Sequence, residues 1–138
     1  MPINETWPQC NCGGIACLER YIGNSYILES SKKAFGNNIT LETLTNLAKK
    51  GNKKAVAIWL DVAEKLGIAL IGTVNLLNPD KIIIGGGVSK AGELILGPLR
   101  KQIKGRAMKD QAMHVKIALA KLGSDAGIIG SSLLVKLK

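Results

Sequence analysis

All three cysteines of the chain lie within eight residues of one another, as Cys10, Cys12 and Cys17. Cysteines clustered in this way favour a metal site over disulfide bonds when a chain shows no sign of secretion. Gly13 and Gly14 lie between them and allow a tight turn that brings the thiolates onto one tetrahedral ion. Zinc suits thiolate ligands, and a closed structural zinc site has four. The cysteines predict a zinc site with three ligands in place; free buried thiols are the alternative.

No fourth ligand is evident near the cysteines. The only histidine, His114, lies far along the chain in a stretch that we expect to be a strand. We therefore expect His114 to have a core or surface role rather than to bind the metal.

A second candidate site is the glycine run of residues 81–89, which reads Lys-Ile-Ile-Ile-Gly-Gly-Gly-Val-Ser. An unbroken apolar run that stops at glycines predicts a strand buried on both faces, as in a parallel sheet. Ligands of α/β proteins bind outside the carboxyl ends of such strands. The alternative is a glycine-rich turn without a ligand. Two known phosphate-binding motifs do not fit, because Lys90 stands where the dinucleotide fingerprint needs its third glycine and no Gly-Lys-Ser or Gly-Lys-Thr follows.

Composition excludes several classes of protein. A chain of 138 residues with 46% hydrophobic but only 4% aromatic residues predicts one domain with an aliphatic core. No apolar run approaches the ~20 residues of a membrane span, and no signal peptide pattern opens the chain, so we expect a cytoplasmic protein without a membrane partner. The formal charge of +9 is carried by lysines scattered along predicted helices. No nucleic-acid-binding signature accompanies them, and nucleic acid is not an expected partner.

The first half of the chain predicts helices. Residues 1–9 read as an extended loop, and a helix is expected from Leu18 to about Phe35. Thr40 caps a short helix that ends at Gly51. Asn52 then caps the longest helix, over residues 53–77, whose second half is apolar nearly all round and is expected to be buried.

The second half alternates between helix and strand. A helical segment is expected from Val88 to Leu96, and Pro98 is expected in the first turn of a continuation. Residues 114–119 predict a second strand. A final helix is expected from Ala126 to Leu137, with small residues at its start. Only two strands are predicted, and two strands make a marginal sheet, so the sequence looks like part of a larger fold.

Three motifs resemble those of the ROK family (repressors, open reading frames and sugar kinases). Residues 10–19 resemble its Cys-x-Cys-Gly-x-x-Gly-Cys-Leu-Glu signature, with Ala16 in place of the usual glycine. Residues 76–89 resemble the adenosine motif with its preceding helix, and residues 122–130 resemble the carboxyl-terminal segment. The likeness runs through essentially all 138 residues in the right order.

The resemblance implies an α/β fold, the carboxyl-terminal part of an actin-like ATPase domain that is helix-rich with few strands. Residues 1–138 would form one partial lobe, with a zinc knuckle at residues 10–17. It implies transfer of phosphate from ATP to a hexose or amino sugar, with magnesium and structural zinc as cofactors. Carried onto this chain, the zinc ligands would be Cys10, Cys12 and Cys17, and the residues that border the adenosine would be Gly85, Gly86, Gly87, Ser89 and Gly127.

The resemblance also shows what this chain does not contain. The family's phosphate loop, its Asn-Asp pair with the catalytic base, and the histidine that completes the zinc site would all precede Met1. We expect the chain to begin about where that histidine ends, to have no catalytic residue of its own and to be inactive as a kinase in isolation. The alternatives are the same lobe of a sugar-responsive ROK repressor, or a zinc-stabilised module that pairs with a separate amino-terminal half or with a second copy.

Overall fold

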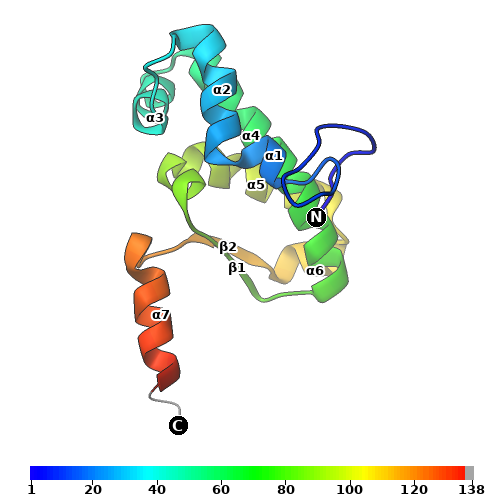
Figure 1. Cartoon of the computed structure of the whole chain (residues 1–138). Coiled ribbons are helices and arrows are strands. Elements are labelled where there is room, and N and C mark those ends of the chain that lie inside the picture. The colour runs from blue at the N-terminus through cyan, green and yellow to red at the C-terminus, as the bar shows by residue number, and fades with distance from the viewer. Residues whose placement is uncertain (136–138) are drawn as a thin grey trace.

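The computed structural model describes residues 1–135, so the last two residues of the helix expected up to Leu137 lie outside the described part. Helices dominate, with one small sheet between them (Figure 1). In chain order the elements are α1 (Glu19–Ile22), α2 (Asn24–Phe35), α3 (Leu41–Lys49), α4 (Lys53–Leu77), β1 (Lys81–Ile84), η1 (Gly87–Ala91), α5 (Glu93–Arg106), α6 (Lys109–His114), β2 (Lys116–Leu119), η2 (Gly123–Asp125) and α7 (Ala126–Val135).

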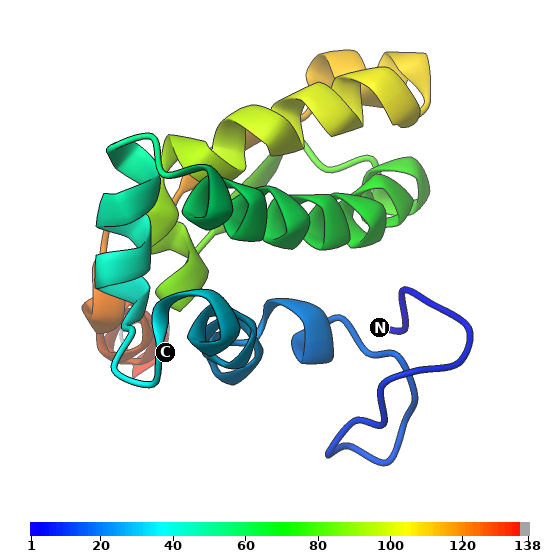
Figure 2. The ribbon, with the colours of Figure 1, turned by 90° about the horizontal axis from the view of Figure 1, so that it is seen from above.

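The long helix α4 forms the centre of the molecule, and its expected bounds are confirmed. It begins where the Asn52 side chain accepts hydrogen bonds from two backbone N–H groups of the first turn, and it ends at Asn78 in the left-handed conformation. Figure 2 shows α5 lying alongside it. Trp59 is 1% exposed in the core between the helices. The prediction that the whole second half is buried is wrong at its end, because Leu76 and Leu77 are 83% and 68% exposed.

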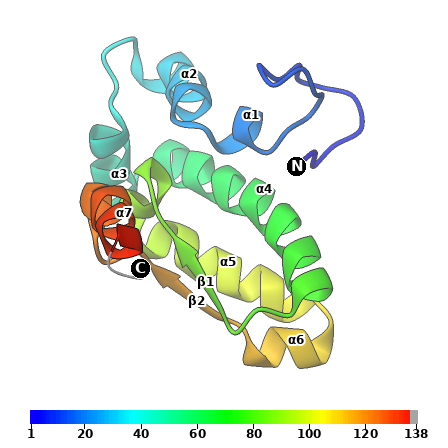
Figure 3. The same cartoon turned by 60° about the horizontal axis from the view of Figure 1, so that its bottom comes forward.

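The sheet consists of β1 and β2, which pair in parallel from Lys81 with Lys116 to Ile84 with Leu119. Figure 3 shows the two strands side by side in front of α5, the helix that connects them on one face. Ile84 and Ile117 are buried, but Ile83 is 62% exposed. The expectation of burial on both faces is therefore wrong, because no described element covers the face that carries Ile83.

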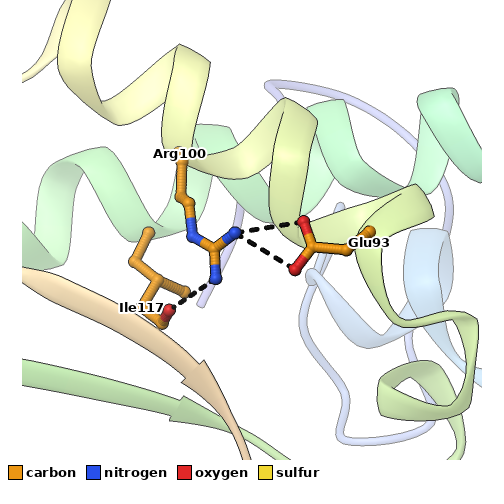
Figure 4. Close-up of polar contacts among 3 residues, drawn as sticks. All are labelled: Glu93, Arg100 and Ile117. Atoms are coloured by element: carbon orange, nitrogen blue, oxygen red, sulfur yellow. Dashed lines mark hydrogen bonds and ion pairs between the residues drawn. The ribbon is translucent and has the colours of Figure 1, made fainter.

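A three-residue polar contact fixes α5 against the sheet. The Arg100 guanidinium lies 3.0 Å from the carboxylate of Glu93, seven residues (about two turns) earlier on the same helix. The same guanidinium donates to the carbonyl of Ile117 on β2 at 3.2 Å (Figure 4). The contact orients the strand pair, and so the glycine turn after β1, relative to α5.

The helix expected over residues 18–35 is interrupted. Gly23 separates α1 from α2 with ψ 148°, an extended conformation. Its N–H still bonds to the carbonyl of Glu19, and a Cβ at Gly23 would lie 2.6 Å from that carbonyl oxygen. Only glycine allows so close an approach, and the chain changes direction there.

Two further expectations are wrong. Pro98 lies inside α5, six residues from its start, rather than in a first turn. The helix continues through the proline because Leu99 and Ile103 beyond it are buried against the core, which compensates for the missing hydrogen bond. His114 ends α6 and is exposed, so it does not lie in a strand; β2 begins two residues later, at Lys116.

The amino-terminal residues form an irregular loop, as expected. Isolated antiparallel bridges join Pro2 to Cys17 and Gln9 to Ile15, which folds the loop back on itself. The peptide bond between Trp7 and Pro8 is cis. In the described residues, no helix combines the length and the apolar content that crossing a bilayer requires.

Candidate functional site

The loop gathers the three cysteines into one cluster. The sulfur atoms of Cys10, Cys12 and Cys17 all lie within 4.8 Å of one another. The loop is held by the Cys10 N–H, which donates to the carbonyl of Gly14 at 2.8 Å, and by the Gly13 N–H, which donates to the carbonyl of Cys10 at 3.0 Å. Gly13 has φ 87°, a conformation that glycine adopts readily.

Hydrogen bonds shift the pKa values of Cys12 and Cys17 in opposite directions. The Gly14 backbone N–H, followed by the thiols of Cys10 and Cys17, lowers the pKa of Cys12 from its ordinary value. A hydrogen bond joins the thiols of Cys12 and Cys17 across a sulfur–sulfur distance of 3.6 Å. That hydrogen bond, followed by partial burial, raises the pKa of Cys17 to about 11. Cys12 therefore ionises before Cys17.

This donor set fits a zinc ion, with three thiolates available as ligands. No other histidine, cysteine or carboxylate joins the cluster in the described part of the chain. The Nδ1 atom of His114 lies 2.6 Å from the carbonyl oxygen of Asp110 on its own helix, so the histidine is not a fourth ligand. The alanine at position 16 is fully buried and has φ 55°, the left-handed conformation that the usual glycine would adopt without strain.

The glycine turn lies at the carboxyl end of β1. Gly86 has φ 73° and ψ −163°, a conformation essentially restricted to glycine. The hydroxyl of Ser89 donates to the Gly86 carbonyl at 2.7 Å, so this side chain closes the turn. A Cβ at Gly85 would lie 3.6 Å from the Cβ of Ala120, just beyond the neighbouring strand. The turn thus exposes bare backbone at the edge where a parallel sheet offers a binding site.

Two cavities flank this turn. One of about 530 Å³ is bounded by Gly85 and Gly87 on one side and by Glu19 and Asn24 on the other. The second, of about 500 Å³, shares Asn24 and Gly87 and is bounded further by Lys90 and residues of α3. Asn24 divides the two, because a Cβ at Gly87 would lie only 2.4 Å from its side-chain oxygen.

Gly127 lies apart from these cavities' walls. It is the second residue of α7, it is exposed, and a Cβ there would meet no atom within 4 Å. Its helix follows β2, so it starts at the same edge of the sheet as the glycine turn. The structure therefore brings the segments together without placing Gly127 beside the turn's cavities.

Sequence reasoning missed the polar residues that face the turn. Glu19 is the last residue of the cysteine signature, but the signature alone does not indicate that its side chain borders a cavity. Asn24 and Lys90 carry no local signal, because they reach the cavities only when α1, α2 and η1 come together.

The comparisons with known proteins agree with this architecture. The family model described as the ROK family matches residues 1–138. A glucokinase of Halalkalibacterium halodurans is 32% identical over 97% of this chain and 45% of its own length. A xylose repressor of Caldicellulosiruptor bescii is 33% identical over 96% of this chain and 37% of its own length. The solved structure of a ROK family glucokinase from Streptomyces griseus, in complex with glucose and AMPPNP, superposes with a TM-score of 0.85 at 26% identity and covers 97% of this chain and 49% of that one. The chain thus spans about half the length, or less, of these relatives.

Proposed function

Because this chain belongs to the ROK family, we propose that residues 1–138 form the carboxyl-terminal, adenosine-binding lobe of an ATP-dependent sugar kinase of the glucokinase type. Its fold is the actin-like ATPase fold of the ROK sugar kinases. The reaction would transfer the terminal phosphate of ATP to a hexose hydroxyl. Since the chain spans about half the length of its relatives, that activity depends on residues outside it.

The cavity of about 530 Å³ at the glycine turn carries this proposal. Its volume is in the range of small-molecule sites, and its lining combines glycine backbone with apolar and polar side chains. Gly85 and Gly87 would let the adenosine approach the strand end, with Ser89 holding the turn's shape. The exposed amide of Asn24 offers both a donor and an acceptor to a purine or ribose at this position.

Zinc, where bound, would act structurally. Cys10, Cys12 and Cys17 would hold it, and the ion would tie the amino-terminal loop to the start of α1. Because α1 supplies Glu19 to the cavity wall, the position of that wall depends on the loop.

The described residues offer no cluster of carboxylates for magnesium. In residues 1–135 the cysteines form the only group of three or more potential metal-binding side chains. Phosphoryl transfer depends on metal ions, a base and phosphate contacts. We therefore propose that the catalytic base and the magnesium site are contributed from outside this chain and that the isolated chain does not phosphorylate glucose.

Nucleotide binding tests the proposal directly. We expect AMPPNP to shift the amide resonances of the glycine turn in an NMR titration of the zinc-loaded chain. Gly85→Val should preserve the fold, since Gly85 is exposed with only ordinary contacts, but should fill the cavity and weaken binding at least about tenfold, as displacement of a bound ring would. Gly72→Val, an equally open position on α4, is the matched control and should bind as the parent does.

A repressor is the second candidate, because a xylose repressor is as similar to this chain as a glucokinase is. In that case the same lobe would serve sugar-dependent regulation. A folded, zinc-loaded chain whose glycine-turn resonances do not respond to AMPPNP would contradict the kinase proposal and favour the repressor. Pairing with a separately supplied amino-terminal half is compatible with either candidate.

A further inference from the structure

A third cavity, of about 290 Å³, lies between the amino-terminal loop and the outer face of α2. Three of the chain's five aromatic residues line it: Trp7, Tyr21 and Tyr26. It shares no lining residue with the cavity at the glycine turn. The function proposed above makes no use of it.

The aromatic walls are held in place. The hydroxyl of Tyr21 donates to the backbone carbonyl of Trp7, which ties the loop to α1. The rings of Tyr21 and Tyr26 meet edge to face, with centroids 6.2 Å apart and planes at 63°. The Trp7 side chain remains 70% exposed. Three ring surfaces of fixed backbone position thus surround a volume near the lower limit of small-molecule sites.

Charged groups complete the lining: Arg20, Lys33 and Glu29. The Nε atom of Arg20 is buried and has no hydrogen-bond partner within residues 1–135. A buried donor without a partner is unfavourable, and most such donors are satisfied by protein, water or a ligand. No ion pair within the described chain engages Arg20, Lys33 or Glu29. All three remain available to a bound molecule.

We propose that this cavity binds a monosaccharide phosphate. Guanidinium and ammonium groups are the side chains that bind phosphate, and Arg20 and Lys33 both line this cavity. The aromatic rings would pack against the apolar face of the sugar ring. The Glu29 carboxylate would accept hydrogen bonds from sugar hydroxyls, a contribution that inorganic phosphate lacks. The combination selects a ligand with both a phosphate and hydroxyls over inorganic phosphate or a neutral sugar.

The inference does not depend on nucleotide binding at the glycine turn, and the two sites can be tested separately. Glucose 6-phosphate is the probe, added to the zinc-loaded chain. The chain has two tryptophans; Trp59 is 1% exposed and Trp7 is 70% exposed. A ligand that covers Trp7 should therefore produce a saturable change in tryptophan fluorescence. Isothermal titration calorimetry provides an affinity that does not rely on the reporter.

Two neighbouring lysines supply a matched pair of variants. Lys33 lines the cavity and Lys32 does not, although both are exposed and each replacement by glutamine removes one charge. Lys33→Gln should weaken glucose 6-phosphate binding about threefold to tenfold, the range of a partly exposed charge contact. Lys32→Gln should leave it unchanged. Arg20→Gln should weaken binding about tenfold or more, as loss of a charged hydrogen bond does.

Three results would overturn the proposal. One is the absence of a saturable response to glucose 6-phosphate. Another is equal binding of inorganic phosphate or glucose, which would mean that the cavity does not recognise both the phosphate and the sugar hydroxyls. The third is an equal loss in Lys32→Gln and Lys33→Gln, which would indicate general attraction to a chain of charge +9. AMPPNP binding should be the same in both lysine variants, which separates this site from the glycine turn.

Discussion

Ala16 has a strained backbone conformation and lies within the loop that carries the three cysteines. Its φ of 55° is unfavourable for any residue with a Cβ, yet its methyl group is fully buried beside Cys17 in the chain. Ala16→Gly relieves the strain and removes the buried methyl, and these effects oppose each other at about 1 kcal/mol each.

We therefore expect Ala16→Gly to change the free energy of unfolding by less than about 1 kcal/mol, and Ala16→Val to lower it by about 3 kcal/mol, since a branched side chain is both strained and overpacked there. Urea unfolding of the zinc-loaded chain measures both. A valine variant as stable as the parent would mean that the loop adopts a different conformation.

The acidity of the cysteines gives a second prediction for the metal-free chain. A lowered pKa at Cys12 means that iodoacetamide should modify this residue before Cys17 near neutral pH. Cys17 should remain the less reactive of the two until the pH approaches its pKa of about 11. Peptide mapping of the alkylated chain as a function of pH gives the order. Modification of Cys17 before Cys12 would contradict it.

The same pKa directions set the sign of the pH dependence of stability. The raised pKa of Cys17 contributes stability that is present below the unfolded value of 9.0 and is lost as the pH rises towards about 11. The lowered pKa of Cys12 contributes stability above its unfolded value, which is lost as the pH falls through the folded value. Both thiols are near the surface, so we expect modest effects. Bound zinc should steepen the dependence near neutral pH, because the folded state then holds thiolates while the unfolded cysteines take up protons, so stability should rise with pH.

At the scale of single residues, the sequence predicted contacts between residues that lie close together in the chain. The cysteines lie together in the chain, so their convergence could be predicted, and their 4.8 Å cluster follows from two glycines and a short turn. The part played by Asn24 could not be predicted, because its proximity to Gly87 joins positions more than sixty residues apart. Whether the cysteines hold zinc and the glycines border adenosine stays a prediction.

At the scale of elements, helix ends with a side-chain cap were predictable. Thr40 accepts a hydrogen bond from the N–H of Thr43 at 3.1 Å, and the helix begins where the sequence indicated. The break at Gly23 and the continuous helix through Pro98 were not predictable. The break at Gly23 comes with a local close approach to the Glu19 carbonyl, which the helical pattern does not reveal. The continuation through Pro98 depends on tertiary burial of the residues that follow it.

The contact between α4 and α5 gives a prediction at this scale. A Cβ at Gly67 would lie 2.4 Å from the side-chain oxygen of Gln102, whose amide donates to the carbonyl of Ala63 at 3.2 Å. Gly67→Ala must displace the end of the Gln102 side chain and break its hydrogen bond to Ala63, which offsets the better helix propensity of alanine, so the free energy of unfolding should change by less than about 1 kcal/mol.

A double-mutant cycle isolates this contact. Gln102→Ala removes the obstacle, so Gly67→Ala should be stabilising in that background, with a coupling of about 1 kcal/mol. Thermal and urea unfolding of the parent, both single variants and the double variant provide the cycle. Additive effects would show that Gly67 and Gln102 do not share this packing constraint.

At the scale of the whole molecule, the count of strands was the informative feature of the sequence. Two apolar strands without further partners predicted a lobe of a larger fold, and the structure has a parallel pair with one open face. The relatives are about twice the length of this chain. Full burial of the inner strand was therefore the wrong expectation for this chain, because burial on the second face needs elements that residues 1–135 do not supply.

The open face of the sheet gives the last prediction. Ile83 is 62% exposed on β1, Leu122 is 52% exposed after β2, and α7 carries further exposed apolar side chains at Ile128, Leu133 and Leu134. Exposed apolar side chains of this kind promote association. The charge of +9 opposes association between copies. Added salt screens the charge but not the apolar contact, so we expect self-association that grows with both protein concentration and ionic strength.

Sedimentation velocity at low and high salt measures this association, and two variants locate it. Ile83→Lys adds a charge in the middle of the open face and should return the chain to a monomer without loss of stability, because the side chain is already exposed. Leu60→Lys makes the same change at an isolated leucine of α4 that is 46% exposed, and it should associate as the parent does. Equal effects of the two variants would assign the association to net charge alone. A monomer under every condition would show that the open face does not drive pairing, and it would weaken the proposal that this lobe acts together with a second chain.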